Sequence, residues 1–115
     1  MQIKLSDIDT TQFSVKEGLW GGKKAFLVTP SFQGVDWTQN NLHLRSSIWN
    51  ESGQLLSGSF WKFVNVGEKP DLFPVPTSLK NSTVVLKLDG STNIIDYIDG
   101  EYHCRSRGTF DAKQL

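Results

Sequence analysis

The sequence predicts a mostly β (α+β) fold made of antiparallel sheets. Apolar residues recur at a spacing of two rather than 3.6, which is the spacing of a strand that buries one face. Gly-Gly and Asp-Gly pairs separate such stretches, and no amphipathic helix is evident beyond a single turn at residues 7–12 or 36–41. A length of 115 residues fits one domain.

Two short alternating stretches predict a first hairpin. They span residues 13–16 and 25–29, on either side of Gly21 and Gly22. Because glycine has no Cβ atom, this pair suits a tight reversal between two strands. We therefore expect the two strands to be neighbours in one sheet.

A second hairpin is predicted farther along the chain. Residues 42–49 alternate in hydrophobicity, the turn-forming residues 50–53 follow, and residues 55–64 return as a strand. One predicted face of residues 42–49 carries Leu42, Leu44 and Ile48, and the other carries His43, Arg45, Ser47 and Trp49. Residues 68–80 contain three prolines and predict a loop, because proline cannot donate to a strand ladder.

The third hairpin has the strongest turn signal. Residues 93–98 and 101–107 are separated by Asp99 and Gly100, and a two-residue hairpin turn needs a positive φ at both positions. The faces of its second strand consist of Tyr102, Cys104 and Ser106 on one side and of His103, Arg105 and Arg107 on the other.

Composition and charge exclude several classes of function. The 12 basic and 12 acidic residues cancel, so any nucleic-acid contact must be local rather than driven by bulk charge. The single cysteine, Cys104, cannot form an intrachain disulfide, and neither it nor His43 nor His103 predicts a metal site. The apolar runs are too short for a membrane span, and the first residues lack a signal-peptide core. These features predict a cytoplasmic protein without a membrane partner.

A lysine motif follows a predicted buried strand at residues 84–86. The chain there reads Lys87-Leu88-Asp89-Gly90-Ser91. Asp89 projects to the same side as Lys87, and Gly90 allows the close approach of a ligand. A lysine amine becomes nucleophilic where nearby cations disfavour its charged form, and the candidate cations are Arg45, Lys62, Arg105 and Arg107. On spacing alone, a plain strand-to-turn connection is the more common interpretation of such a string.

This motif resembles the nucleotidyl-acceptor motif of the covalent nucleotidyltransferases, and most closely that of the bacteriophage-type ATP-dependent RNA ligases. Thr92 stands where DNA ligases and messenger-RNA capping enzymes usually carry an arginine. Upstream, an arginine-bearing strand at residues 44–49 and a Lys-Phe-Val-Asn segment within residues 60–68 are similar to elements of the RNA ligases. Downstream, residues 105–108 resemble their basic-Ser-basic-Gly element.

The resemblance implies an ATP-grasp-like nucleotidyltransferase domain that seals RNA ends, as in RNA repair. Lys87 would be the catalytic nucleophile, which attacks the α-phosphate of ATP to form lysyl-AMP. AMP would then pass to a 5′-phosphate end of RNA, and a 3′-hydroxyl end would displace it. The implied cofactors are ATP and Mg²⁺, and the implied cofactor-binding residues are Arg45, Lys62, Asp89, Gly90 and Arg107.

The resemblance also sets the expected domain organisation. Residues 1–115 correspond to the N-terminal part of one nucleotidyltransferase domain, because the later motifs of the family should follow Gly108 and the sequence contains no counterpart of them. We therefore expect a further C-terminal segment or a partner chain to complete the site. The chain by itself is expected to be catalytically incomplete.

Two other functions remain open on the sequence. A non-enzymatic module would hold a single strand of nucleic acid with Arg45, Arg105, Arg107 and exposed aromatic side chains. A structural remnant without activity would bind neither nucleotide nor RNA. The tryptophans fit a core role better than base stacking, and they are Trp20, Trp37, Trp49 and Trp61.

Overall fold

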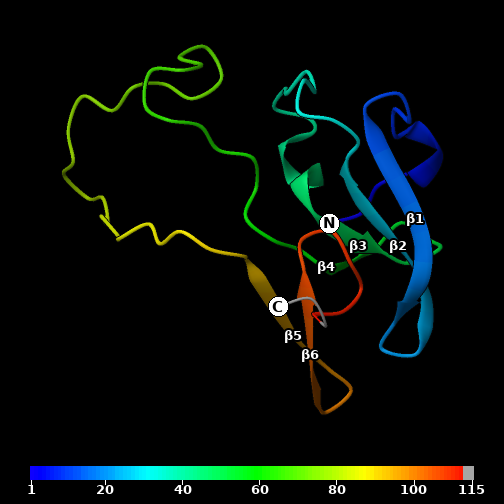
Figure 1. Ribbon diagram of the computed structural model, residues 1–115. Coiled ribbons are helices and arrows are strands. Elements are labelled where there is room, and N and C mark those ends of the chain that lie inside the picture. Colours follow the sequence, from blue (N-terminus) through cyan, green and yellow to red (C-terminus); the bar gives the residue numbers. More distant parts are fainter. Residues whose placement is uncertain (113–115) are drawn as a thin grey trace.

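The computed structural model describes residues 1–112. Within them the chain is mostly β, with two antiparallel sheets and almost no helix, as the sequence predicts. Figure 1 shows the strands gathered on one side of the molecule and a long arc of chain on the other. The elements in chain order are the 3-10 helix η1 (Leu5–Asp7), β1 (Phe13–Trp20), β2 (Lys23–Pro30), the 3-10 helix η2 (Leu42–Arg45), β3 (Ser47–Trp49), β4 (Leu55–Ser57), β5 (Asn93–Ile98) and β6 (Glu101–Ser106).

The larger sheet has the strand order β1-β2-β3-β4, and all neighbours in it are antiparallel. Its first hairpin is confirmed. Trp20 pairs with Lys23, and the two residues between them, Gly21 and Gly22, have φ values of 60° and 78°. Glycine adopts this left-handed backbone readily because it carries no Cβ atom. The first strand is longer than the predicted residues 13–16, since it continues to the turn.

The predicted strand at residues 42–49 is wrong in its first half. Leu42–Arg45 forms η2, and only Ser47–Trp49 forms a strand, β3. Just before the helix, the Asn41 side chain accepts a hydrogen bond from the backbone N–H of Thr38 at 2.8 Å. Side-chain bonds of this kind to the local backbone compete with the hydrogen bonds of a strand ladder.

The core consists of two apolar clusters on opposite faces of the larger sheet. Leu27 and Val28 are successive residues of β2 but belong to different clusters, which places the clusters on opposite faces. Leu44 and Ile48 are likewise divided between the two clusters, so the predicted common face of these residues is wrong. The alternation of apolar and polar residues does not identify a single buried face here, because both faces of the sheet are buried. The buried members are Phe13, Val28, Val35, Leu44 and Trp49 in one cluster and Trp20, Ala25, Leu27 and Ile48 in the other.

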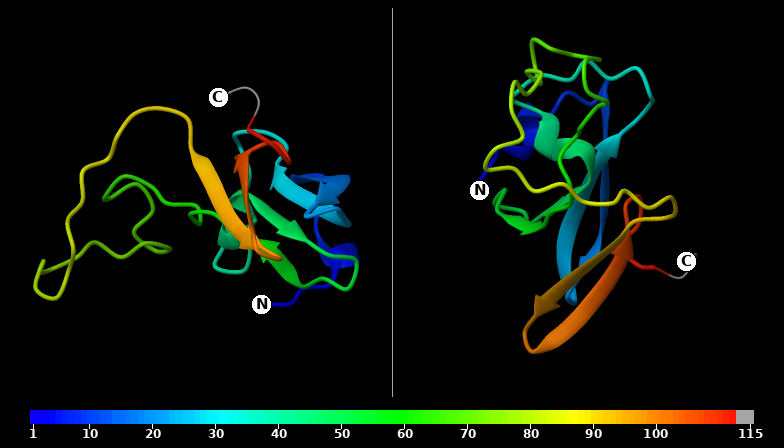
Figure 2. Two further views of the ribbon diagram at one scale, coloured as in Figure 1. Left: turned by 90° about the horizontal axis from the view of Figure 1, so that it is seen from below. Right: turned by 90° about the vertical axis from the view of Figure 1, so that its left-hand side faces the viewer.

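After β4 the chain leaves the sheet and runs through the arc, residues 58–92, before it returns as β5 (Figures 1 and 2). The predicted strand at residues 55–64 is therefore cut to Leu55–Ser57, and the predicted loop at residues 68–80 lies within the arc. The predicted buried strand at residues 84–86 is wrong, because these side chains are 78%, 77% and 84% exposed. Their hydrophobicity favours burial, but no described strand pairs with them.

The hairpin of β5 and β6 is confirmed and forms the smaller sheet. Ile98 pairs with Glu101, and the turn residues Asp99 and Gly100 have φ values of 50° and 84°. Ile98 and Phe110 pack against the cluster that contains Trp20. The hairpin and the turn after it therefore cover one face of the larger sheet, as Figure 2 shows.

Gly18, in the middle of β1, is the point at which Phe110 meets the larger sheet. A Cβ atom at Gly18 would lie 2.4 Å from Phe110 Cε2, so the ring has room only because residue 18 has no side chain. We predict that Gly18→Ala lowers the free energy of unfolding by about 1–3 kcal/mol, because Phe110 must move out of its contact.

Urea denaturation of the two proteins measures this effect. Gly58→Ala is the matched control, since the nearest atom to a Cβ there is Leu55 Cδ2 at 3.8 Å, an ordinary contact distance. Equal unfolding midpoints for the Gly18 and Gly58 variants would contradict the packing described for Phe110.

Candidate functional site

A cleft of about 990 Å³ is lined by the end of β2 and the residues that follow it, by η2, by the start and the end of the arc, and by the end of β6 with the two residues after it. Its lining thus combines segments that are far apart in the sequence. The lining residues are 29–33, Trp37, Arg45, Lys62, 90–92 and 106–108.

Three cations line this cleft, and they are Arg45, Lys62 and Arg107. The lining contains no carboxylate, and none of the three forms an ion pair within residues 1–112. Burial lowers the pKa of the Arg45 guanidinium, and the charge of Arg107 lowers it further. The cleft therefore concentrates uncompensated positive charge, which favours an anionic ligand.

Backbone and ring contacts hold two of these cations. The backbone N–H of Lys62 donates to the Leu42 carbonyl oxygen at 2.9 Å, which fixes the start of the arc against η2. Lys62 Nζ lies 5.9 Å from the ring centroid of Trp37, and the Arg45 guanidinium lies 4.8 Å from that of Phe63. An aromatic face attracts a cation without neutralising it, so both charges stay available to a ligand.

The third cation, Arg107, is placed by a buried network centred on Arg105. Ser46 Oγ donates to the Arg107 carbonyl oxygen at 2.7 Å and accepts from Arg105 Nη1 at 2.8 Å. Ser57 Oγ accepts from Arg105 Nε at 2.9 Å and donates to Asp96 Oδ2 at 2.6 Å. Burial lowers the pKa of Arg105 to about 10, while the Asp96 carboxylate raises it, so the guanidinium stays charged at neutral pH. Arg105 itself is fully buried and does not line the cleft.

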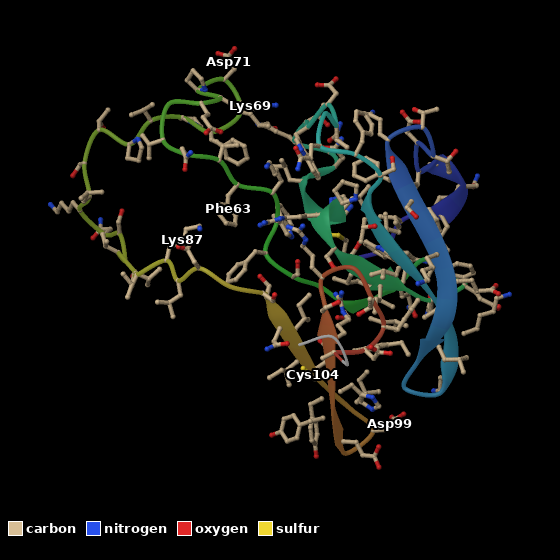
Figure 3. The ribbon with its side chains drawn as sticks, viewed as in Figure 1. Phe63, Lys69, Asp71, Lys87, Asp99 and Cys104 are labelled. Carbon is tan, nitrogen blue, oxygen red and sulfur yellow. The ribbon has the colours of Figure 1, made fainter. Side chains whose placement is uncertain are left out.

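Lys87 lies on the arc, away from both sheets (Figure 3). Its side chain is 74% exposed, and its Nζ atom is 3.9 Å from Asp89 Oδ1. Gly90 follows within the same segment and does line the cleft, with a φ of 145°. Four predicted site residues therefore come together, namely Arg45, Lys62, Gly90 and Arg107. Lys87 and Asp89 lie outside this group, and the roles of all six stay predictions.

Sequence reasoning missed the two serines that hold the network. Ser46 and Ser57 are buried in the structure, but in the sequence they stand beside other polar or small residues, so no pattern marked them. Phe32 and Trp37 line the cleft without any motif to mark them. Of the other tryptophans, Trp20 and Trp49 are buried in the two clusters, and Trp61 is exposed.

The lining residues do not fit a magnesium ion held by the protein. Mg²⁺ prefers carboxylate oxygens, and none of the described residues that line the cleft carries one. Across residues 1–112, moreover, no three Asp, Glu, His or Cys side chains gather in a way that could hold a metal.

Comparison with known proteins does not assign a family, because no protein-family model, curated protein or solved structure matches the chain. The RNA-ligase resemblance therefore stays a prediction from the residues quoted above. Neither short helix in the described part of the chain has the length and hydrophobicity to cross a bilayer.

The buried network gives a direct test of how the cleft is held. We predict that Ser57→Ala lowers the free energy of unfolding by about 1–3 kcal/mol, because Arg105 Nε loses its acceptor in a buried site. Urea denaturation measures this loss. Ser82→Ala, on the exposed arc, is the control and leaves the midpoint unchanged. A Ser57 variant as stable as the Ser82 variant would contradict a structural role for the network.

Proposed function

We propose that this chain is an ATP-dependent RNA ligase with the ATP-grasp-like fold of the covalent nucleotidyltransferases. In this proposal the cleft binds the triphosphate of ATP, and Lys87 receives the AMP. One observation carries the proposal: three cations converge on a cleft without carboxylates, and Gly90 of the lysine motif lines the same cleft. The substrates are ATP and RNA ends with a 5′-phosphate and a 3′-hydroxyl.

Phosphate binding follows from the donors that line the cleft. Guanidinium groups donate paired hydrogen bonds to phosphate oxygens, and an ammonium group adds a mobile point charge. Burial lowers the pKa of Arg45, and repulsion by the charge of Arg107 lowers it further. A polyphosphate relieves this repulsion. Gly90 carries no side chain, so the backbone of the motif can approach the nucleotide closely.

The proposed transfer step forms one bond and breaks one. The neutral amine of Lys87 attacks the α-phosphorus of ATP, the bond between that phosphorus and the β-phosphate oxygen breaks, and pyrophosphate leaves with the electron pair. The attacking nitrogen then releases a proton to solvent water, and the product is a lysyl-AMP phosphoramide. The step requires the segment that carries Lys87 to move toward the cleft, so that the side chain leaves solvent and lies near Arg45 and Arg107, which disfavour its protonated form.

The non-enzymatic nucleic-acid module has less support. It needs Arg105 as a contact for the phosphate backbone, but this side chain is fully buried between the two sheets. Only Arg45 and Arg107 of its proposed arginines face the cleft. Binding of single-stranded RNA without any effect of ATP would be the result that favours this module.

ATP affinity tests the binding half of the proposal. We predict that Arg107→Ala weakens ATP binding on the order of tenfold, because a charged donor to phosphate is lost. Isothermal titration calorimetry measures the dissociation constant. Lys23→Ala removes an exposed cation at the β1–β2 turn and serves as the control with unchanged affinity. Equal affinity for ATP in both variants would show that the cleft is not the binding site.

Covalent labelling tests the transfer half. We predict that ATP labelled at the α-phosphate transfers its label to the protein, and that Lys87→Ala abolishes the labelling. Gel electrophoresis follows the labelled protein. Acid treatment should remove the label, because a phosphoramide bond is acid-labile. Lys80→Ala alters another exposed lysine of the same arc and should keep the label. A label that persists in Lys87→Ala would overturn the assignment of the nucleophile.

A further inference from the structure

The wall of the cleft after β2 carries an exposed aromatic ring, that of Phe32. Phe32 lines the cleft together with the cations Arg45, Lys62 and Arg107, yet 51% of its surface is exposed. A single exposed phenylalanine on a protein surface needs no special explanation. Phe32, however, faces a cationic cleft, where its ring offers a flat apolar surface beside phosphate donors. Arrangements of this kind bind nucleotides by stacking and charge together.

The ring of Phe32 is seated against a glycine. A Cβ atom at Gly34 would lie 2.9 Å from Phe32 Cε2 and 3.2 Å from Cδ2, so a side chain at this position would displace the ring. Gly34 is not among the glycines with a positive φ, so the backbone does not require glycine there. What the position does require is room for the ring of Phe32.

Trp37, the other aromatic residue of the lining, is already engaged. Its ring packs edge to face with Phe13 at a centroid distance of 5.7 Å, and Lys62 Nζ lies 5.9 Å from its centroid. Phe32 has no ring or cation partner of this kind within residues 1–112. It is therefore the ring that remains free to stack on a ligand.

We propose that Phe32 stacks on the base of the nucleotide whose phosphates Arg45, Lys62 and Arg107 bind. The inference builds on the proposed function and makes the ligand of the cleft a nucleoside triphosphate rather than an inorganic polyphosphate. The volume of about 990 Å³ leaves room for a nucleoside beside the phosphates. Stacking recognises the flat face that every base shares, so Phe32 contributes affinity and not the choice of base.

Two probes, ATP and inorganic tripolyphosphate, separate stacking from phosphate binding in calorimetric titrations. The wild-type protein should bind ATP about tenfold more tightly than tripolyphosphate, because only ATP carries a base. Phe32→Leu should remove this advantage and leave tripolyphosphate binding unchanged, whereas Phe32→Tyr should keep it. Gly34→Ala should reduce ATP binding in the same selective way, because it displaces the ring. Phe60→Leu alters an exposed ring outside the cleft and is the matched control.

The outcomes distinguish this inference from the proposed function. Equal affinity of the wild-type protein for the two probes, or an ATP affinity unchanged in Phe32→Leu, would overturn stacking by Phe32 while leaving phosphate binding intact. Failure of both probes to bind would overturn the proposed function itself, and the inference with it. Circular dichroism of each variant confirms that a lost affinity is not caused by unfolding.

Discussion

The buried guanidinium of Arg105 is the interaction on which the arrangement of the two sheets depends. It reaches from β6 to Ser46, which precedes β3, and to Ser57 at the end of β4. Burying a charged group is costly unless it is hydrogen-bonded. The two hydroxyls bind Arg105 Nε and Nη1 and so hold the hairpin on the larger sheet, while Nη2 is buried without a hydrogen-bond partner among residues 1–112. Because Ser46 also donates to the Arg107 carbonyl, the same network sets one wall of the cleft.

Among residues 1–112, no ion pair compensates the three cations that line the cleft. Burial and then the charge of Arg107 lower the pKa of Arg45, and no carboxylate of residues 1–112 lines the cleft. Lys62 and Arg45 are held by aromatic rings instead, which position a cation without cancelling its charge. In the proposed function, this arrangement would lower the stability of the free protein, and a phosphate bound in the cleft would restore it.

The arc separates the proposed nucleophile from the phosphate donors. Residues 84–86 are apolar but exposed, and Lys87 follows them with its side chain in solvent. The solvent-accessible surface is 8357 Å², against about 6,300 Å² for a compact chain of this mass. The arc accounts for part of this excess, because it lies away from both sheets and exposes its residues to solvent. The first requirement of the proposed chemistry is therefore a movement of this segment toward the cleft. Gly90 lies where the arc meets the cleft and has the backbone freedom for such a movement.

The sequence by itself determined the hairpins, because the backbone conformation of a tight turn depends on the residues of the turn itself. The Gly21-Gly22 and Asp99-Gly100 pairs meet the φ requirement of their turns without help from distant residues. It also singled out Arg45, Lys62, Gly90 and Arg107, which the fold gathers in one cleft.

Only the tertiary structure decided whether an apolar or charged residue is buried. The run at residues 84–86 lacks a neighbouring strand and is exposed, whereas Arg105 is buried where Ser57 of the larger sheet and Ser46, which follows η2, accept its hydrogen bonds. Burial depends on contacts between segments that are far apart in the chain, and the spacing of residues within one strand does not contain that information.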